Sequence, residues 1–118
     1  MDNLRLKQLT DGGIDVENGL VRFMGNEDFF ERFLKKFLDD ENYEKLKEAA
    51  KNGDVEKMIT ASHTLKGVCG NLSMTELFAL FDRQVKELRA GNTDSATALM
   101  GEIDAAYKKA INAINGLD

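Results

Sequence analysis

The sequence predicts an all-α fold, an antiparallel up-down four-helix bundle with a short additional helix at its N-terminal end. Apolar residues recur mainly at spacings of three and four, and no sustained alternation typical of a β-strand occurs. Glycines and capping side chains divide the 118 residues into segments with short connections, which favour antiparallel neighbouring helices. We expect an N-terminal arm over residues 1–12 and one helical bundle domain over residues 13–118.

The N-terminal third of the chain contains two predicted helices after the arm. Residues 1–13, closed by Gly12 and Gly13, fit either a short helical turn or a loose arm. Asp15 can cap a short helix over residues 16–24, and Gly25 can end it. Asn26 can cap the next helix, which carries a strong apolar stripe. The stripe consists of Phe30, Phe33, Leu34 and Phe37.

A second apolar stripe follows in the same segment and points in a different direction. It consists of Tyr43, Leu46 and Ala50. At about 100° per residue, this stripe lies nearly opposite the first one. Either the helix bends near residues 40–42, or its two halves pack against different neighbours.

Two helix boundaries are well marked in the second half of the chain. Gly53 ends one helix and Asp54 can cap the next, over residues 55–72. Ser73 and Glu76 have the spacing of a capping box, which predicts the start of another helix, ending at Gly91. The predicted inward residues of these two helices are Val55, Met58, Leu65, Cys69, Leu72, Leu77, Phe78, Phe81, Val85 and Leu88.

The last predicted helix begins at Asn92 or Thr93 and completes the bundle. Its apolar stripe consists of Ala96, Leu99, Ile103, Tyr107, Ala110 and Ile114.

Charge and cysteine content restrict the classes of partner and compartment. The net charge is −5, with lysines mixed among acidic residues, so nucleic acid and anionic membranes are poor partners. Cys69 is the only cysteine, so no internal disulfide can form and a reducing compartment is expected. The longest apolar run, residues 77–81, is far shorter than a membrane span, and the N-terminus lacks the apolar core of a signal peptide. We therefore expect a cytoplasmic protein.

His63 is the only histidine, and it lies on the helix predicted over residues 55–72. On a helical wheel it falls roughly 150° from the centre of the apolar stripe, on the solvent side. Lys66, Gly67 and Gly70 fall within about 60° of His63 and form one patch with it. Glu56, Ile59 and Thr60 extend the patch toward the start of the helix.

The residue types in this patch suit the capture of an anion. An imidazole can act as a nucleophile, carry a proton or bind a metal, and Lys66 could hold an anion placed on the ring. Glycine leaves room for that anion and for the backbone of another protein. Ser62 points about 100° away from His63, which argues against a hydrolytic triad. One histidine and one cysteine are too few for a metal site, and no GxxxxGK[ST] or GxGxxG loop occurs, so we expect no metal and no cofactor.

The run Ser62-His63-Thr64-Leu65-Lys66-Gly67, followed by Gly70-Asn71-Leu72, strongly resembles the histidine-containing phosphotransfer (HPt) domain family. The resemblance covers roughly residues 13–114. It implies that His63 accepts a phosphoryl group from the aspartyl phosphate of a receiver domain and passes it to another receiver. It also implies that Lys66 steadies the phosphoryl oxygens, that Gly67 clears room for docking, and that the magnesium ion and the acidic cluster belong to the receiver.

The same resemblance suggests the partners and the surface that they contact. A receiver domain, a hybrid histidine kinase or both would dock over Ile59, Thr60, Gly70 and Gln84. Gln84 is the nearest candidate for a polar contact with the histidine from the next helix, although Val85 is the residue in step. The chain has Ser73 where the family often has glycine.

Two functions are therefore open: a monomeric phosphorelay carrier without kinase or hydrolase activity of its own, or a helical adaptor that binds a receiver-like partner without being phosphorylated. The pair formed by His63 and Lys66 favours the carrier, because a pure binding surface needs neither residue.

Overall fold

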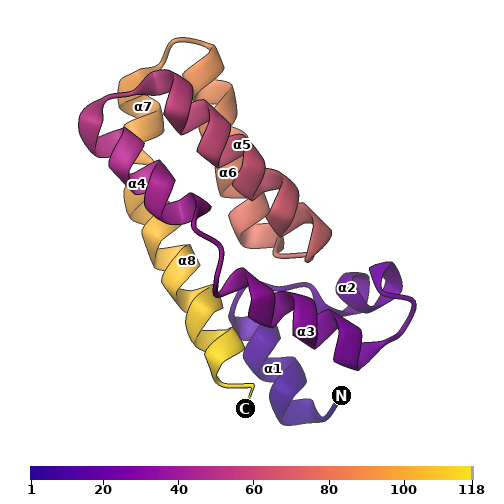
Figure 1. Cartoon of the computed structure of the whole chain (residues 1–118). Coiled ribbons are helices and arrows are strands. Elements are labelled where there is room, and N and C mark those ends of the chain that lie inside the picture. Colours follow the sequence, from indigo (N-terminus) through magenta and orange to yellow (C-terminus); the bar gives the residue numbers. More distant parts are fainter. Residues whose placement is uncertain (118) are drawn as a thin grey trace.

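A computed structural model describes residues 1–117, and within this range all regular structure is helical. The molecule is elongated, with principal extents of 44 × 23 × 20 Å. Figure 1 shows α4, α5, α6 and the α7–α8 segment running up and down along the long axis, while α1, α2 and α3 gather at one end. The predicted all-α bundle is confirmed. The helices are α1 (Asn3–Asp11), α2 (Val16–Arg22), α3 (Glu27–Phe37), α4 (Asn42–Asn52), α5 (Val55–Asn71), α6 (Thr75–Arg89), α7 (Thr93–Ala98) and α8 (Met100–Asn115).

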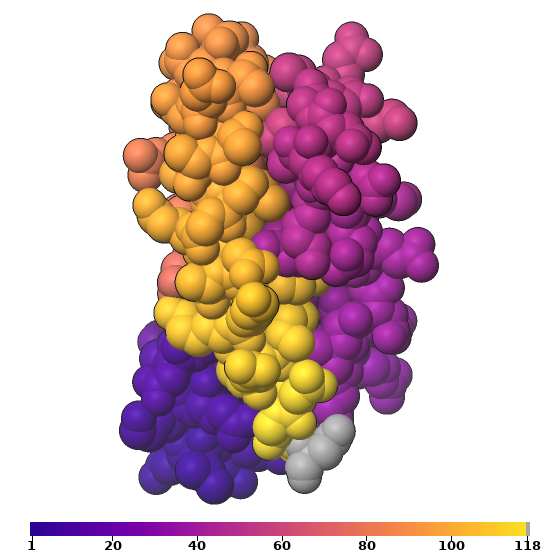
Figure 2. Space-filling model, turned by 90° about the vertical axis from the view of Figure 1, so that its left-hand side faces the viewer, coloured from indigo at the N-terminus to yellow at the C-terminus, as the bar shows by residue number. Residues whose placement is uncertain are grey.

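The N-terminal helix α1 packs against the C-terminal half of α8. Leu9 is fully buried, and Gln8 Nε2 donates a hydrogen bond to the carbonyl of Ala113 at 2.7 Å. Arg5 Nη1 donates to the carbonyl of Leu117 at 2.6 Å. Figure 2 shows the N-terminal residues, in indigo, beside the C-terminal end of α8, in yellow. Residues 3–11 therefore form a packed helix, and the domain division after residue 12 stays a prediction.

Three predicted N-caps are confirmed, and each caps the helix that the sequence pattern assigned to it. The side chains of Asp15, Asn26 and Asp54 each accept a hydrogen bond from the backbone N–H three residues ahead, at the starts of α2, α3 and α5. Gly53 ends α4 with a φ of +67°, which glycine adopts without steric cost. Gly53 and Asp54 together set the start of α5, the helix that carries His63.

The change of apolar stripe between residues 37 and 43 corresponds to a break in the helix. The chain leaves helical geometry between α3 and α4, where Asp40 Oδ1 accepts the backbone N–H of Asn42 at 2.8 Å. Helix α3 packs against α2 and α8, whereas α4 packs against α5. The two alternatives drawn from the sequence, a bend near residues 40–42 and different neighbours for the two halves, are therefore both correct. The buried residues are Phe30, Leu34 and Phe37 in α3 and Tyr43, Leu46 and Ala49 in α4.

The predicted capping box at the start of α6 is wrong. Ser73 has a φ of +56°, and a capping residue needs an extended backbone. Its hydroxyl donates to Asn18 Oδ1 at 2.7 Å, and its carbonyl accepts the N–H of Asp15 at 2.8 Å. Glu76 instead binds Lys109 Nζ at 2.6 Å. Ser73 therefore ties the α5–α6 turn to the start of α2 and leaves α6 without a side-chain cap.

Three further expectations about packing need correction. The last predicted helix is interrupted at Leu99, which separates α7 from α8. The rings of Phe33 and Phe78, predicted to point inward, are each 37% exposed. Phe33 packs against Phe23 and Phe29, with ring centroids 5.4 and 5.6 Å apart, and Phe29 is itself exposed. No helix within residues 1–117 combines the length and the apolar character that crossing a membrane requires.

Close packing between α2 and α3 gives a test of the fold. A Cβ atom added at Gly19 would lie 2.7 Å from Cε1 of Phe30, and Phe30 is fully buried and has no room to move away. Gly19→Ala should therefore lower the free energy of unfolding by about 1–3 kcal/mol, as overpacked cores do. Urea unfolding followed by circular dichroism measures this change.

The matched control for that test is Gly101→Ala. Gly101 is an exposed glycine of α8, and an added Cβ would meet no atom within 4 Å. The same substitution there should leave stability unchanged or raise it by up to about 1 kcal/mol, because alanine favours helix more than glycine does. Equal effects at the two positions would contradict the described packing.

Candidate functional site

The orientation of α5 is set by a buried polar contact with α6. Ser62 is fully buried, and its hydroxyl donates to Gln84 Oε1 at 2.8 Å. Gln84 is also fully buried, and its amide donates to the carbonyl of Ala96 at 3.1 Å. Adjacent residues of a helix point about 100° apart, so burying Ser62 turns His63 away from the core.

His63 is exposed on the outer side of α5, as predicted. Its imidazole has no hydrogen bond or ion pair with any other residue in the described range 1–117. Both ring nitrogens are therefore accessible to a reacting group from solvent or from a partner. The neighbouring Cys69 is fully buried, and this burial raises the pKa of its thiol, so it is an inert core residue.

Lys66 follows His63 by one turn, but its ammonium group is engaged with α6. Nζ lies 3.0 Å from Asp82 Oδ1 and 5.9 Å from the centroid of the Phe78 ring. The sequence analysis predicted a cation near the imidazole but identified no partner for that cation. In the structure its partner is the carboxylate of Asp82. The other oxygen of Asp82 lies 2.9 Å from Lys86 Nζ. Hydrogen bonds from Lys86 and then from Lys66 hold the pKa of Asp82 below its usual range, so this carboxyl is ionised at neutral pH.

The two glycines of the patch differ in what surrounds them. Gly67 is exposed, and an added Cβ would meet no atom within 4 Å. Gly70 is half-buried, and an added Cβ would lie 3.1 Å from Phe78 Cδ1. Only Gly67 therefore leaves open surface beside His63. At Gly70 the missing side chain lets Phe78 of α6 pack closely against α5, so this glycine serves the contact between two helices and does not open the surface.

The remaining predicted contact residues have three different environments. Thr60 is exposed, and its hydroxyl donates to the carbonyl of Glu56 at 3.1 Å. Ile59 is half-buried against the core, so only part of its side chain is available to a partner. Gln84 cannot contact a partner because it is fully buried, and this prediction is wrong. Its inward position could have been recognised from its spacing with Phe81 and Leu88 on the apolar face of α6.

Asp82 and Phe78 are site residues that the sequence analysis did not identify. Both lie on α6, four residues apart and therefore on one face of that helix. Their proximity to Lys66 depends on the register between α5 and α6, and no pattern within either helix determines that register. A wheel of α5 alone could not reveal them.

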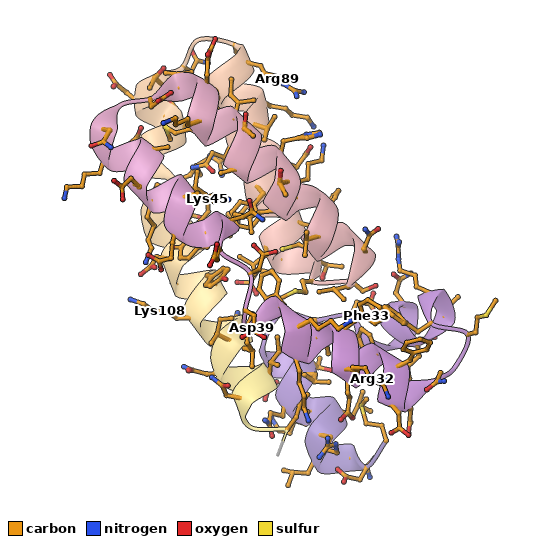
Figure 3. The ribbon with its side chains drawn as sticks, viewed as in Figure 1. Arg32, Phe33, Asp39, Lys45, Arg89 and Lys108 are labelled. Atoms are coloured by element: carbon orange, nitrogen blue, oxygen red, sulfur yellow. The ribbon has the colours of Figure 1, made fainter. Side chains whose placement is uncertain are left out.

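An aromatic surface flanks the C-terminal half of α5. Phe23 and Phe33 line a groove of about 430 Å³ together with Val68 and Asn71 of α5. Figure 3 shows Phe33 and Arg32 projecting from α3 at the end of the molecule where α2 also lies. Lys36 Nζ lies 4.7 Å from the centroid of the Phe33 ring, and Asp40 also lines the groove, so the apolar surface is accompanied by one cation and one carboxylate.

The site as a whole is a nucleophilic imidazole on an open helix surface, with a cation one turn away and a carboxylate behind the cation. No group of three or more histidine, cysteine, aspartate or glutamate residues in the described part of the chain is arranged to hold a metal ion. The arrangement suits the reception of a negatively charged group on the ring.

A family model described as "Hpt domain" matches residues 32–113, which includes His63, Lys66 and Asp82 and extends from α3 into α8. Neither a curated protein nor a solved structure matches the chain.

The buried contact between Ser62 and Gln84 gives a test of how α5 is oriented. Gln84→Leu should lower the free energy of unfolding by about 1–3 kcal/mol, because it removes the near acceptor of the buried Ser62 hydroxyl and leaves only the carbonyl of Phe81, at 3.5 Å. Adding Ser62→Ala should recover part of that loss, since both polar partners are then replaced. Chemical denaturation of the four proteins of this cycle measures the coupling, and simple additivity would show that the two side chains are independent.

Proposed function

Since the chain belongs to the Hpt domain family, we propose that it carries phosphoryl groups in a phosphorelay, with His63 as the acceptor. Members of this family are phosphotransfer carriers that pair with receiver domains, and they are not catalytic enzyme domains. The observation that carries the proposal is the exposure of the only histidine of the chain, within the matched segment and without an internal partner.

The proposed reaction is a reversible transfer between an aspartate of the receiver and the imidazole. A neutral ring nitrogen of His63 attacks phosphorus, and the bond between phosphorus and the aspartyl oxygen breaks. The electron pair of that bond stays on the aspartate, which leaves as a carboxylate, and the ring becomes a phosphorylated imidazolium. The reverse reaction with a second receiver passes the group on.

Lys66 supports this transfer by its position and charge. It lies one helical turn after His63, and its ammonium is carried on a flexible stem. Because phosphoryl transfer depends mainly on positioning and charge stabilisation, one nearby cation is a substantial contribution from the carrier. The resemblance to the family assigns the magnesium ion and the acidic cluster to the receiver.

Receiver docking is proposed over the open side of α5. Gly67 presents backbone without a side chain, and Ile59 and Thr60 flank His63 on the same side of the helix. The groove between α3 and the end of α5 continues this surface with aromatic side chains. A monomeric carrier without kinase or hydrolase activity of its own, located in the cytoplasm, remains our prediction.

The alternative is an adaptor that binds a receiver-like partner without being phosphorylated. The exposed imidazole argues against it, because no hydrogen bond or ion pair within residues 1–117 gives His63 a structural role in the fold. The charge group formed by Lys66, Asp82 and Lys86 also favours the carrier, since it has two cations and one carboxylate in an acidic chain, and Lys66 lies one helical turn after His63.

A labelling experiment separates the two functions. Incubation with a phosphorylated receiver domain should give the wild-type chain a label that is labile in acid and stable in base, as expected for phosphohistidine. His63→Gln should acquire no label while keeping the circular dichroism spectrum of the wild type. Label that persists on the variant would overturn the role of His63, and label on neither protein would favour the adaptor.

The docking surface can be tested by adding bulk at Gly67. Gly67→Gln should lower the affinity for the receiver domain at least about tenfold, because a side chain would stand between the two surfaces. Gly101→Gln is the matched control, since Gly101 is equally open but lies on α8. Isothermal titration measures both affinities, and equal affinity of the two variants would remove Gly67 from the proposed interface.

A further inference from the structure

The ion-pair group of Lys66, Asp82 and Lys86 contains two ammonium groups and one carboxylate. One carboxylate, Asp82, binds two ammonium groups on different oxygens: Lys66 at 3.0 Å through Oδ1 and Lys86 at 2.9 Å through Oδ2. Lys86 comes from the same helix at a spacing of four residues, whereas Lys66 comes from α5. The group therefore has a net charge of +1, and Lys66 is the cation of the group that belongs to α5, one helical turn after His63.

We propose that Asp82 is a positioning residue that holds Lys66 between transfers and releases it to the phosphoryl group on His63, while Lys86 stays on the carboxylate. This inference rests on the proposed function. After release, Asp82 and Lys86 remain as a neutral pair, so no bare carboxylate is left near the phosphoryl oxygens. A single pair of Lys66 and Asp82 would lack this property, because freeing the lysine would uncover a negative charge that repels the phosphoryl group.

The contacts of Lys66 are weak enough for such an exchange. Its side chain is 29% exposed and that of Asp82 is 25% exposed, so water reaches both groups and can solvate them when the pair opens. A phosphoryl group carries nearly two negative charges and offers three acceptor oxygens, which outweigh one shared carboxylate oxygen.

Phe78 keeps the released lysine close to the site. The ammonium of Lys66 lies 5.9 Å from the centroid of the Phe78 ring, and that ring packs against Gly70. The stem of Lys66 therefore lies between α5 and α6 and not in free solution. Because the side chain of Lys66 is already restrained, moving its ammonium from Asp82 to the phosphoryl group costs little further conformational entropy.

The test uses Asp82→Asn, which preserves the shape of the side chain and removes its charge. The donor is phosphoramidate: its phosphorus–nitrogen bond breaks as the bond to the ring nitrogen of His63 forms, and ammonia leaves. Asp82→Asn should raise the rate of His63 phosphorylation about two- to fivefold, the change expected when a surface ion pair no longer competes for Lys66. Asp11→Asn, which removes a carboxylate paired with Lys7 on α1, is the matched control and should leave the rate unchanged.

A double-mutant cycle with Lys66→Ala decides whether Asp82 acts through the lysine. Lys66→Ala should slow phosphorylation, and Asp82→Asn should then have no further effect. An equal rate increase in both backgrounds would mean that Asp82 acts only through its own charge, and no increase in the wild-type background would mean that it does not compete for Lys66. Either result overturns the proposal.

A second measurement follows the ammonium groups directly. In ¹⁵N–¹H spectra of side-chain ammonium groups, phosphorylation of the wild type should shift the signal of Lys66 and leave that of Lys86 in place. Movement of both signals, or of neither, would contradict the exchange of partners. If phosphoramidate does not phosphorylate the wild type at all, the proposed function fails and this inference fails with it; phosphorylation without coupling overturns the inference alone.

Discussion

The hydrogen bond between Ser62 and Gln84 is the constraint on which the site depends. It is buried between α5 and α6, where an unpaired hydroxyl or amide would be costly. Since neither group can turn outward without losing its partner, α5 has a fixed rotation about its axis. The next residue along the helix is His63, and its exposure follows from the burial of Ser62.

The same contact surface shapes the electrostatics of the site. Because α6 is fixed against α5, Asp82 and Phe78 face Lys66, and Gly70 gives the ring of Phe78 room to pack. The site is therefore built from two helices, although its reactive residue and its cation lie on one. The net charge of the chain is −5, yet the charge group that includes Lys66, one helical turn after His63, carries +1, which is the sign that attracts an incoming phosphoryl group.

Properties that depend on one helix at a time could be predicted from the sequence. The caps formed by Asp15, Asn26 and Asp54 use a side chain and a backbone group three residues apart, so local sequence suffices. The outward direction of His63 and the openness of Gly67 follow from the helical repeat.

Properties that depend on contacts between elements could not be predicted in this way. Ser73 has the spacing of a capping residue, but its contacts with Asn18 and Asp15 impose a backbone that excludes capping. The pairing of Lys66 with Asp82 requires the register of α5 against α6, which no periodicity within one helix gives. Gln84 is an intermediate case: its inward position is readable from α6, whereas its hydrogen bond to Ser62 is not.

The central claim is that the ring of His63 is the group that receives phosphorus. The most direct measurement is a ³¹P–¹H correlation spectrum of the phosphorylated chain, because a phosphorus atom bonded to a ring nitrogen couples to the ring protons. The chain has one histidine, so a single such correlation would identify the site without further mapping. We expect the phosphorus signal to correlate with the ring protons of His63. A phosphorus signal coupled only to aliphatic protons, as in phosphoserine or phosphothreonine, would show that His63 is not the acceptor.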